Sequence, residues 1–294
     1  PLQPMTASTS TTSDLGPSYD TPPLDARSQE LRLRLIDSLE GGGRGHTGAS
    51  FSLIEILRVL FDDVLNLRAG EPAWPDRDRL ILSKGHGCLA LYALLADKGF
   101  FDQDELLDQC KPGAMLGGHP EVGTPGVEAS TGALGHGMPI ATGIAMALRL
   151  KANAARVFAI VGDGECDEGS IWEAAMHAAK HRLSNLTVIV DYNKLQSYGP
   201  VREVLDLEPF ADKWRAFGFS VVEVDGHNVS DLRTAFTSLP FQADAPNCII
   251  AHTVKGKGIP EAEFNPTWHH RSKFSPEEFS IMRRAVGLTQ TLKA

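Results

Sequence analysis

The sequence predicts an α/β protein, a doubly wound parallel sheet with helices on both faces. Two observations predict this class. Short runs rich in β-branched residues alternate with longer segments of helical periodicity along most of the 294 residues. Several of these runs end in glycine and polar residues, as strands do at the edge of an open sheet where ligands bind. The order strand, helix, strand further implies parallel strands joined by crossover helices.

The N-terminal region divides into a tail and the start of the domain. Residues 1–24 are predicted to be disordered because they are rich in Ser, Thr and Pro and poor in large apolar residues. Residues 25–294 are expected to form one domain. Leucines spaced by four residues between positions 31 and 39 predict its first helix, which a run of three glycines ends. After a glycine-rich loop, Ser52 and Glu55 predict a capping box that opens a second helix.

The remaining elements follow the same alternation. A short strand, RLILS, leads into Lys84, Gly85 and His86, so His86 is expected at the carboxyl end of a strand. Further strands are predicted at 157–161, 186–191, 219–224 and 248–253. Helices are predicted at 88–96, 132–150 with glycine interruptions, 168–181, 208–217, 230–239 and from 275 onward.

Composition limits the classes of partner. The net charge is −9 and no run of Lys or Arg occurs, which argues against nucleic acid or an anionic membrane as a main partner. The four cysteines are far apart, which argues against a disulfide framework or a zinc–thiolate site. No segment has the length and apolarity of a membrane span, and no secretion signal is recognisable. A cytoplasmic protein is therefore expected.

The run VGDG followed by Asn193 carries the strongest chemical signal. Gly162 and Gly164 lie where a strand ends and a helix begins, so backbone N–H groups there can approach a diphosphate. Asp163 supplies an oxygen ligand, and Asn193 ends the next strand after about the length of a crossover helix. With the backbone carbonyl of Leu195, these groups predict a site for Mg²⁺, or for Ca²⁺ or Mn²⁺. A tight turn and a strand-end cap are the alternative, which the paired spacing disfavours.

The segment from Gly162 to Asn193 resembles the thiamine-diphosphate motif in its transketolase form. The runs GRGHTG, LSKGHG, GGHPE and STGALGHG, then DGHN and TVKGKG, also resemble transketolase signatures in the order of that family. The resemblance extends from about Leu24 to the end of the chain. It implies a thiamine-diphosphate-dependent enzyme with Mg²⁺ that transfers a two-carbon ketol unit from a ketose donor, a sugar or sugar phosphate, to an aldehyde or to a specialised acceptor.

The resemblance also implies roles for histidines. His46 and His119 would line the substrate channel, and His86 would contact cofactor or donor. His269 would be the late active-site histidine, with the adjacent His270 as the alternative. Imidazoles with pKa values near neutrality suit the proton transfers that such a reaction needs.

Predicted cofactor contacts come from several segments. Lys255 and Lys257 could offset the net acidity near a diphosphate or a sugar phosphate, but the sequence favours the interpretation of both as solvated loop lysines. Glu165 is expected on the first turn of a helix, where the dipole favours a negative side chain. Together with the contacts that the resemblance implies, the predicted set is His86, Gly132, Ala133, Leu134, Gly162, Asp163, Gly164, Glu165, Asn193, Lys257 and His269.

The resemblance covers only the first half of a transketolase. It therefore implies a partner, a C-terminal transketolase subunit carrying the pyrimidine-binding domain, in an α2β2 assembly; a piece of a longer chain is the competing explanation. Two other functions remain open. The α subunit of a 2-oxoacid dehydrogenase shares the GDG-to-Asn motif but not LSKGHG or GGHPE. A non-catalytic cofactor-binding subunit is disfavoured by the intact Asp163, Asn193, His46 and His86.

Overall fold

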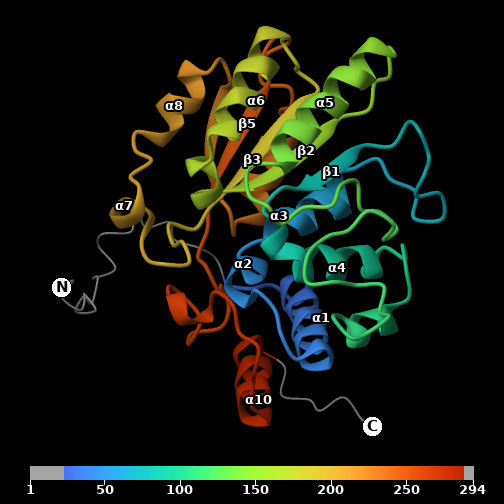
Figure 1. The fold of residues 1–294 in the computed structure, drawn as a ribbon, viewed down its shortest axis with the longest axis vertical. Helices are drawn as coiled ribbons and strands as arrows, with labels where there is room; N and C mark the ends of the chain where they lie inside the picture. Colours follow the sequence, from blue (N-terminus) through green and yellow to red (C-terminus); the bar gives the residue numbers. More distant parts are fainter. Residues whose placement is uncertain (1–22, 288–294) are drawn as a thin grey trace.

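A computed structural model describes residues 23–287, in which five parallel strands form one sheet in the order β1-β2-β3-β5-β4 (Figure 1). The predicted α/β class with a parallel sheet is therefore confirmed. The predicted disordered tail lies outside the described residues except for its last two. The strands are β1 Arg79–Leu82, β2 Val157–Gly162, β3 Leu186–Tyr192, β4 Ser220–Asp225 and β5 Asn247–His252.

Helices cover both faces of this sheet. Successive residues of β2 alternate between two hydrophobic cores, since Phe158 and Ile160 belong to one while Ala159 and Val161 belong to the other. Helices α1, α3, α4 and α9 close the first core, and α5, α6 and α8 close the second. Figure 1 shows α5 and α6 on one side of the sheet and α1, α3 and α4 away from them. Burial on both faces explains why the central strands are almost continuously apolar rather than alternating.

The helical elements agree with most of the predicted segments. Within the described residues they are α1 Ala26–Gly42, α2 Thr47–Phe51, α3 Ile54–Val59, η2 Leu60–Val64, η3 Gly85–Gly87, α4 Cys88–Asp97, η4 Gln103–Asp108, α5 Gly137–Leu150, η5 Gly164–Asp167, α6 Gly169–Lys180, α7 Val201–Val204, α8 Phe210–Ala216, α9 Val229–Thr237, η6 Pro266–Trp268 and α10 Pro276–Ala285. The last helix begins with a capping box, as its N-terminal sequence indicated.

The predicted capping box at Ser52 and Glu55 is wrong. Ser52 ends α2 instead of opening a helix, and its hydroxyl donates to Asp191 Oδ2 at 2.7 Å. Glu55 forms an ion pair with Arg32 at 2.6 Å. Both side chains are buried and have distant polar partners, and the one local backbone contact of Ser52 is to the carbonyl of Ala49 at 3.1 Å, not to an N–H group of the following helix.

The helix predicted over 132–150 is shorter than expected. Helix α5 begins at Gly137, because Gly132 (φ 140°) and Gly135 (φ 79°) adopt backbone conformations that interrupt a right-handed helix. The residues before α5 form a loop instead. That loop contacts the end of β2, where the backbone N–H of Gly135 donates to Glu165 Oε1 at 2.9 Å.

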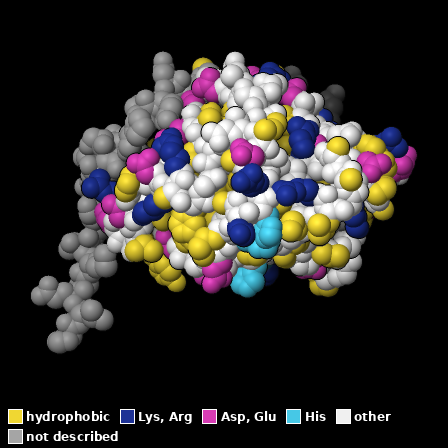
Figure 2. All heavy atoms as spheres, turned by 90° about the horizontal axis from the view of Figure 1, so that it is seen from above, with side chains coloured by type: hydrophobic (Ala, Val, Ile, Leu, Met, Phe, Trp, Pro, Cys, Tyr) yellow, Lys and Arg dark blue, Asp and Glu magenta, His cyan; other side chains and the backbone are white. Residues whose placement is uncertain are grey.

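The surface is mixed in character. On the face shown in Figure 2, basic side chains lie among acidic and hydrophobic ones. The excess of acidic residues in the sequence, 37 against 28 basic, is therefore not separated into large regions of one sign on that face. Within residues 23–287, no helix combines the length and apolarity needed to cross a membrane.

Candidate active site

Residues that follow the five strands meet at one edge of the sheet. Lys84 follows β1, Asp163 follows β2, Asn193 follows β3, His227 follows β4 and Lys255 follows β5. Parallel strands end at the same edge, which brings these loops together. A pocket of about 150 Å³ opens there. Its lining residues are Ala49, Lys84, His86, Leu134, Gly162, Asp163, Gly164, Glu165, Asn193, Leu195, Gln196, Ser197, Lys255 and His269.

Asp163 and Asn193 both line this pocket and both are buried. The carboxylate of Asp163 accepts hydrogen bonds from the backbone N–H of Gly164 at 2.7 Å and of Lys194 at 2.5 Å. The second of these bonds joins the carboxylate directly to the residue after Asn193. The structure thus brings the two predicted ligands to one place.

Asp191 sets the direction of the Asn193 side chain. The amide Nδ2 of Asn193 donates to Asp191 Oδ2 at 3.3 Å, while its Oδ1 accepts from the backbone N–H of Leu195 at 3.2 Å. An ionised carboxylate can only accept, so the amide nitrogen must face Asp191 and the oxygen must face away. Burial alone would raise the pKa of Asp191, but the Lys84 ammonium outweighs it and lowers that pKa.

The charge of Asp163 fits a bound cation. Burial and the neighbouring Asp191 raise the pKa of Asp163, because a carboxylate there is desolvated and repelled. Lys84 pairs with Asp191 rather than with Asp163. A divalent cation would neutralise the Asp163 carboxylate, and the Asn193 and Leu195 oxygens are ligands of the kind that Mg²⁺ and Ca²⁺ take. The donor set therefore fits a hard metal ion.

Lys255 is buried in this site, so its interpretation as a solvated loop lysine is wrong. Its Nζ donates to the carbonyl of Leu195 at 2.7 Å and lies 3.0 Å from His269 Nδ1. Burial lowers the pKa of Lys255 to about 8, and Lys84 also lowers it. Lys257, the predicted contact, lies outside the pocket lining with its Nζ 3.9 Å from Glu263. The position of Lys255 directly after β5, like that of Lys84 after β1, was the sequence signal that could have identified it.

The four predicted histidines cluster beside the pocket. The ring centroid of His46 lies 4.5 Å from that of His86, 5.4 Å from that of His119 and 5.6 Å from that of His269. His270 also joins the cluster, 4.6 Å from His46. These rings come from four separate segments, so only the tertiary fold assembles them.

Burial keeps the four predicted histidines neutral. It lowers the pKa of His46 to about 2, of His269 to about 3 and of His86 to about 4; the surrounding histidines also disfavour a charge on His46, and Lys84 and Lys255 disfavour one on His86 and His269. The pKa of His119 is also lowered, again chiefly by burial. Because Lys255 Nζ can only donate, Nδ1 of His269 accepts and its Nε2 carries the hydrogen. A neutral ring with a free ring nitrogen can accept a proton or a hydrogen bond from a substrate hydroxyl, whereas His269, whose Nδ1 already accepts from Lys255, offers the Nε2 hydrogen as a donor.

The loop before α5 contributes unequally to the site. Leu134 lines the pocket, whereas Ala133 is exposed and outside its lining. Gly132 packs against His119, where an added Cβ would lie 2.7 Å from His119 Cδ2. A side chain at this position would therefore displace a histidine of the cluster.

Glu165 lines the pocket but turns its carboxylate into the protein. Its oxygens accept hydrogen bonds from the Ser83 hydroxyl and from the backbone N–H groups of Gly135 and Gly162, the last at 3.1 Å. The predicted dipole interaction is therefore not its main contact. Glu165 connects the turn after β2 to the loop before α5, which positions Gly162 and Gly164.

The fold and pocket define a cofactor-binding domain of the doubly wound α/β class. Residues 25–293 match the family model described as transketolase, thiamine diphosphate binding domain. The chain therefore belongs to the transketolase family, and it is an enzyme subunit of the transferase class. These findings favour the transketolase interpretation over a 2-oxoacid dehydrogenase α subunit.

Relatives of similar length are themselves named as subunits. The chain is 42% identical over 242 residues to the 6-deoxy-6-sulfo-D-fructose transketolase subunit SqwG of a Clostridium species, covering 82% of this chain and 88% of that one. It is 38% identical over 247 residues to an apulose-4-phosphate transketolase subunit from Phocaeicola vulgatus, covering 84% and 88%. The transketolase structure from Campylobacter jejuni superposes with a TM-score of 0.82 at 30% identity. That match covers 89% of this chain but only 42% of the other.

Proposed function

We propose that this chain is the diphosphate-binding subunit of a two-subunit transketolase, which transfers a two-carbon ketol unit from a ketose donor to an aldehyde acceptor. The observation that carries the proposal is the meeting of Asp163 and Asn193, from successive strand ends, beside a cluster of neutral histidines. Similarity to chains named as transketolase subunits supports the same reaction class.

The metal and the cofactor would occupy the pocket at the carboxyl edge of the sheet. Asp163, Asn193 and the carbonyl of Leu195 would hold Mg²⁺, with Ca²⁺ or Mn²⁺ as substitutes. Gly162 and Gly164 leave room for a diphosphate at the turn after β2. When bound, thiamine diphosphate supplies the carbon that takes up and releases the two-carbon unit.

Positive charge in the pocket would complement the phosphates. Lys84 and Lys255 both line it and both are buried, in a protein whose net charge is −9. Charges in such a partly desolvated site act more strongly than they do in bulk water. The cofactor contacts proposed here therefore include these two lysines, together with His86, His269 and Leu134.

The histidine cluster would handle protons of the sugar. We assign His46, His119 and His269 to hydrogen bonds with donor and acceptor hydroxyls, since their rings are neutral and gathered beside the pocket. A neutral imidazole can take a proton from a hydroxyl and return it to a developing alkoxide. His86 lines the pocket itself and is placed to contact cofactor or donor.

A partner chain would complete the site. The pocket of about 150 Å³ is smaller than the roughly 300–1,000 Å³ of typical ligand sites, which, with the relatives named as subunits, supports a second wall contributed by another chain. We propose that a C-terminal transketolase subunit with a pyrimidine-binding domain supplies it, in an α2β2 assembly. Four free cysteines are compatible with a reducing cytoplasm as the place of action.

The names of the relatives indicate a class of substrate. The two relatives above are named for sugars that carry a phosphate or a sulfonate. We therefore propose an anionic ketose as the donor, while the acceptor is an aldehyde.

Co-expression with the partner subunit tests this function. The purified complex should show ketol transfer with thiamine diphosphate and Mg²⁺, and no oxidative decarboxylation of 2-oxoacids. Calorimetry should detect cofactor binding to the complex and its loss in Asp163→Ala. Cofactor binding without ketol transfer to any aldehyde would identify a non-catalytic subunit instead.

A further inference from the structure

The side chains of Arg32, Glu55 and His227 form a buried cluster of hydrogen bonds that connects three segments of the chain outside the pocket lining. The Arg32 guanidinium donates to both carboxylate oxygens of Glu55, at 2.6 and 3.0 Å. The ring of His227 contacts the same carboxylate, with Nδ1 2.8 Å from Glu55 Oε2. All three side chains are almost fully buried. None of them lines the pocket.

The hydrogen bonds define which nitrogen of His227 carries a hydrogen. Its Nε2 lies 2.8 Å from the backbone nitrogen of Val254, which can only donate, so Nε2 accepts. Nδ1 then carries the hydrogen and donates to Glu55. Burial would raise the pKa of Glu55, but the guanidinium of Arg32 and the bond from His227 outweigh it and lower that pKa. The carboxylate is therefore held charged between two donors.

The same group holds both ends of a short segment. His227 accepts from the N–H of Val254, and Nε of Arg32 donates to the carbonyl of Lys257 at 3.0 Å. Lys255 lies between these two anchors and faces the pocket. A third bond, from the backbone N–H of Gly256 to the carbonyl of Gly48 at 3.1 Å, fastens the middle of the segment.

We propose that His227 and Arg32, joined by Glu55, are positioning residues that hold residues 254–257 so that the ammonium group of Lys255 faces the phosphate-binding pocket. This inference rests on the proposed function, because an anionic phosphate is the ligand that Lys255 would meet. Glu55 does not line the pocket and joins the two anchors, which hold the segment by their own hydrogen bonds.

Two variants of His227 test whether this residue acts through its hydrogen bond from the backbone N–H of Val254 or only by filling buried space. In His227→Asn the amide nitrogen replaces Nδ1 and can still donate to Glu55, but nothing accepts from Val254. In His227→Gln the longer amide reaches the place of Nε2, so its oxygen can accept from Val254. Since both leave the Arg32–Glu55 pair intact, both should fold, which the melting temperature checks.

Hydrogen exchange of the full chain measures the anchoring directly. In His227→Asn, the amides of residues 254–258 should exchange roughly tenfold faster, as expected when a buried hydrogen bond is lost. Amides of β2 and β3 should be unchanged. In His227→Gln, exchange should stay within about twofold of the parent. Equal exchange in both variants, or no change in either, overturns the proposal.

Cofactor affinity links the anchoring to the pocket. Calorimetry on the complex with the partner subunit measures the affinity for thiamine diphosphate. In His227→Asn this affinity should fall roughly 10-fold, a modest loss of the size expected when a residue that only supports a ligand-binding residue is changed. It should recover in His227→Gln. Faster exchange with unchanged affinity overturns the positioning role. If Asp163→Ala also leaves the affinity for thiamine diphosphate unchanged, the proposed function is wrong. The hydrogen-exchange result does not depend on cofactor binding and still tests the anchoring of residues 254–257.

Discussion

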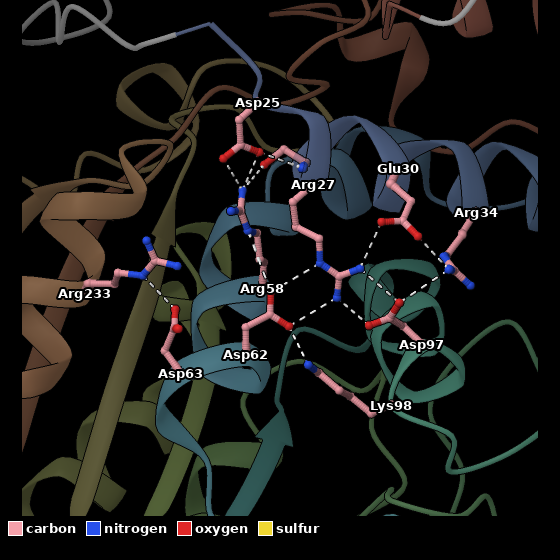
Figure 3. A network of polar contacts seen from close by, with 11 residues as sticks. Asp25, Arg27, Glu30, Arg34, Arg58, Asp62, Asp63, Asp97, Lys98 and Arg233 are labelled. Carbon is pink, nitrogen blue, oxygen red and sulfur yellow. Dashed lines mark hydrogen bonds and ion pairs between the residues drawn. The ribbon is translucent and has the colours of Figure 1, made fainter. Parts of the chain in front are cut away.

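Two groups of charged side chains, both involving α1, behave differently. The outer group, shown in Figure 3, links α1 to η2 and α4, and η2 to α9. There Arg27 pairs with Glu30, Asp62 and Asp97, and Asp62 is also reached by Lys98. The inner group lies beside and behind the pocket and comprises the Arg32–Glu55–His227 contacts, the Lys84–Asp191 pair, Asp163 and Lys255.

The two groups differ in how exposed their side chains are to solvent and in how many acidic partners each arginine has. In the outer group the Arg27 side chain is 24% exposed and has three acidic partners, so water and the remaining partners can compensate for one loss. In the inner group Arg32 is 0% exposed and Glu55 is its one carboxylate partner within residues 23–287. Removing one partner there leaves the other charge buried without an opposite charge beside it. Inner charges should therefore govern function and folding, and outer ones should contribute little.

The largest effect is expected at Asp163. In Asp163→Ala the affinity for Mg²⁺ and thiamine diphosphate should fall by more than roughly 10–100-fold, which is the loss expected when a residue that only supports a metal ligand is changed. The free energy of unfolding without cofactor should change by no more than about 1 kcal/mol, since the relief of a desolvated and repelled charge offsets the loss of the two hydrogen bonds from Gly164 and Lys194. Calorimetry and urea unfolding measure the two quantities. Large destabilisation with normal affinity would mean that Asp163 is structural.

Glu55→Ala should give the largest loss of folding stability. It leaves Arg32 buried without its carboxylate, which costs about 3–5 kcal/mol of the free energy of unfolding. Urea unfolding followed by circular dichroism measures this cost. Replacement of both partners, Arg32→Met with Glu55→Leu, is the control and should recover much of the stability. A Glu55→Ala protein as stable as the parent would remove the distinction between the two groups.

The pH dependence of cofactor affinity should be moderate. Because burial lowers the pKa of Lys255 to about 8, its ammonium is charged below that pH and loses its proton above it. Affinity for thiamine diphosphate should therefore fall several-fold between about pH 7.5 and 9, as an ionic hydrogen bond is lost. Lys255→Met should bind more weakly at pH 7.5 and show a flatter profile. Parallel profiles for the two proteins would assign the titration to another group.

The smallest effect is expected at Asp97 in the outer group. Asp97→Asn should lower the free energy of unfolding by at most about 1 kcal/mol, because Arg27 keeps Glu30 and Asp62 as partners. The loss should shrink further in 0.5 M salt, at which the Debye length is short. Thermal unfolding at two salt concentrations measures it. A loss as large as that of Glu55→Ala would contradict the proposed redundancy.

Local sequence patterns predicted most of the fold. The apolar runs of β2 and β3, and the periodicity of the helices between strands, depend on neighbours in the chain, so they could be recognised without a structure. The same holds for Asp163 and Asn193, since the ends of consecutive parallel strands must lie at one edge of the sheet. The start of α5 was placed too early because the backbone angles of Gly132 and Gly135 are set by loop packing.

The sequence by itself determined the class of fold and the turn after β2, because these follow from spacing and residue type, while the histidine-bearing loops were recognised from their resemblance to the family's signatures. Only the tertiary structure decided which charges are buried and what they contact. Glu55 meets His227 across 172 positions of chain, and no local pattern reports such a pair. The same is true of Lys255, whose place in the pocket depends on anchors from α1 and from the loop after β4. Burial is a property of the packed molecule, and the cost of desolvating a charge appears only there.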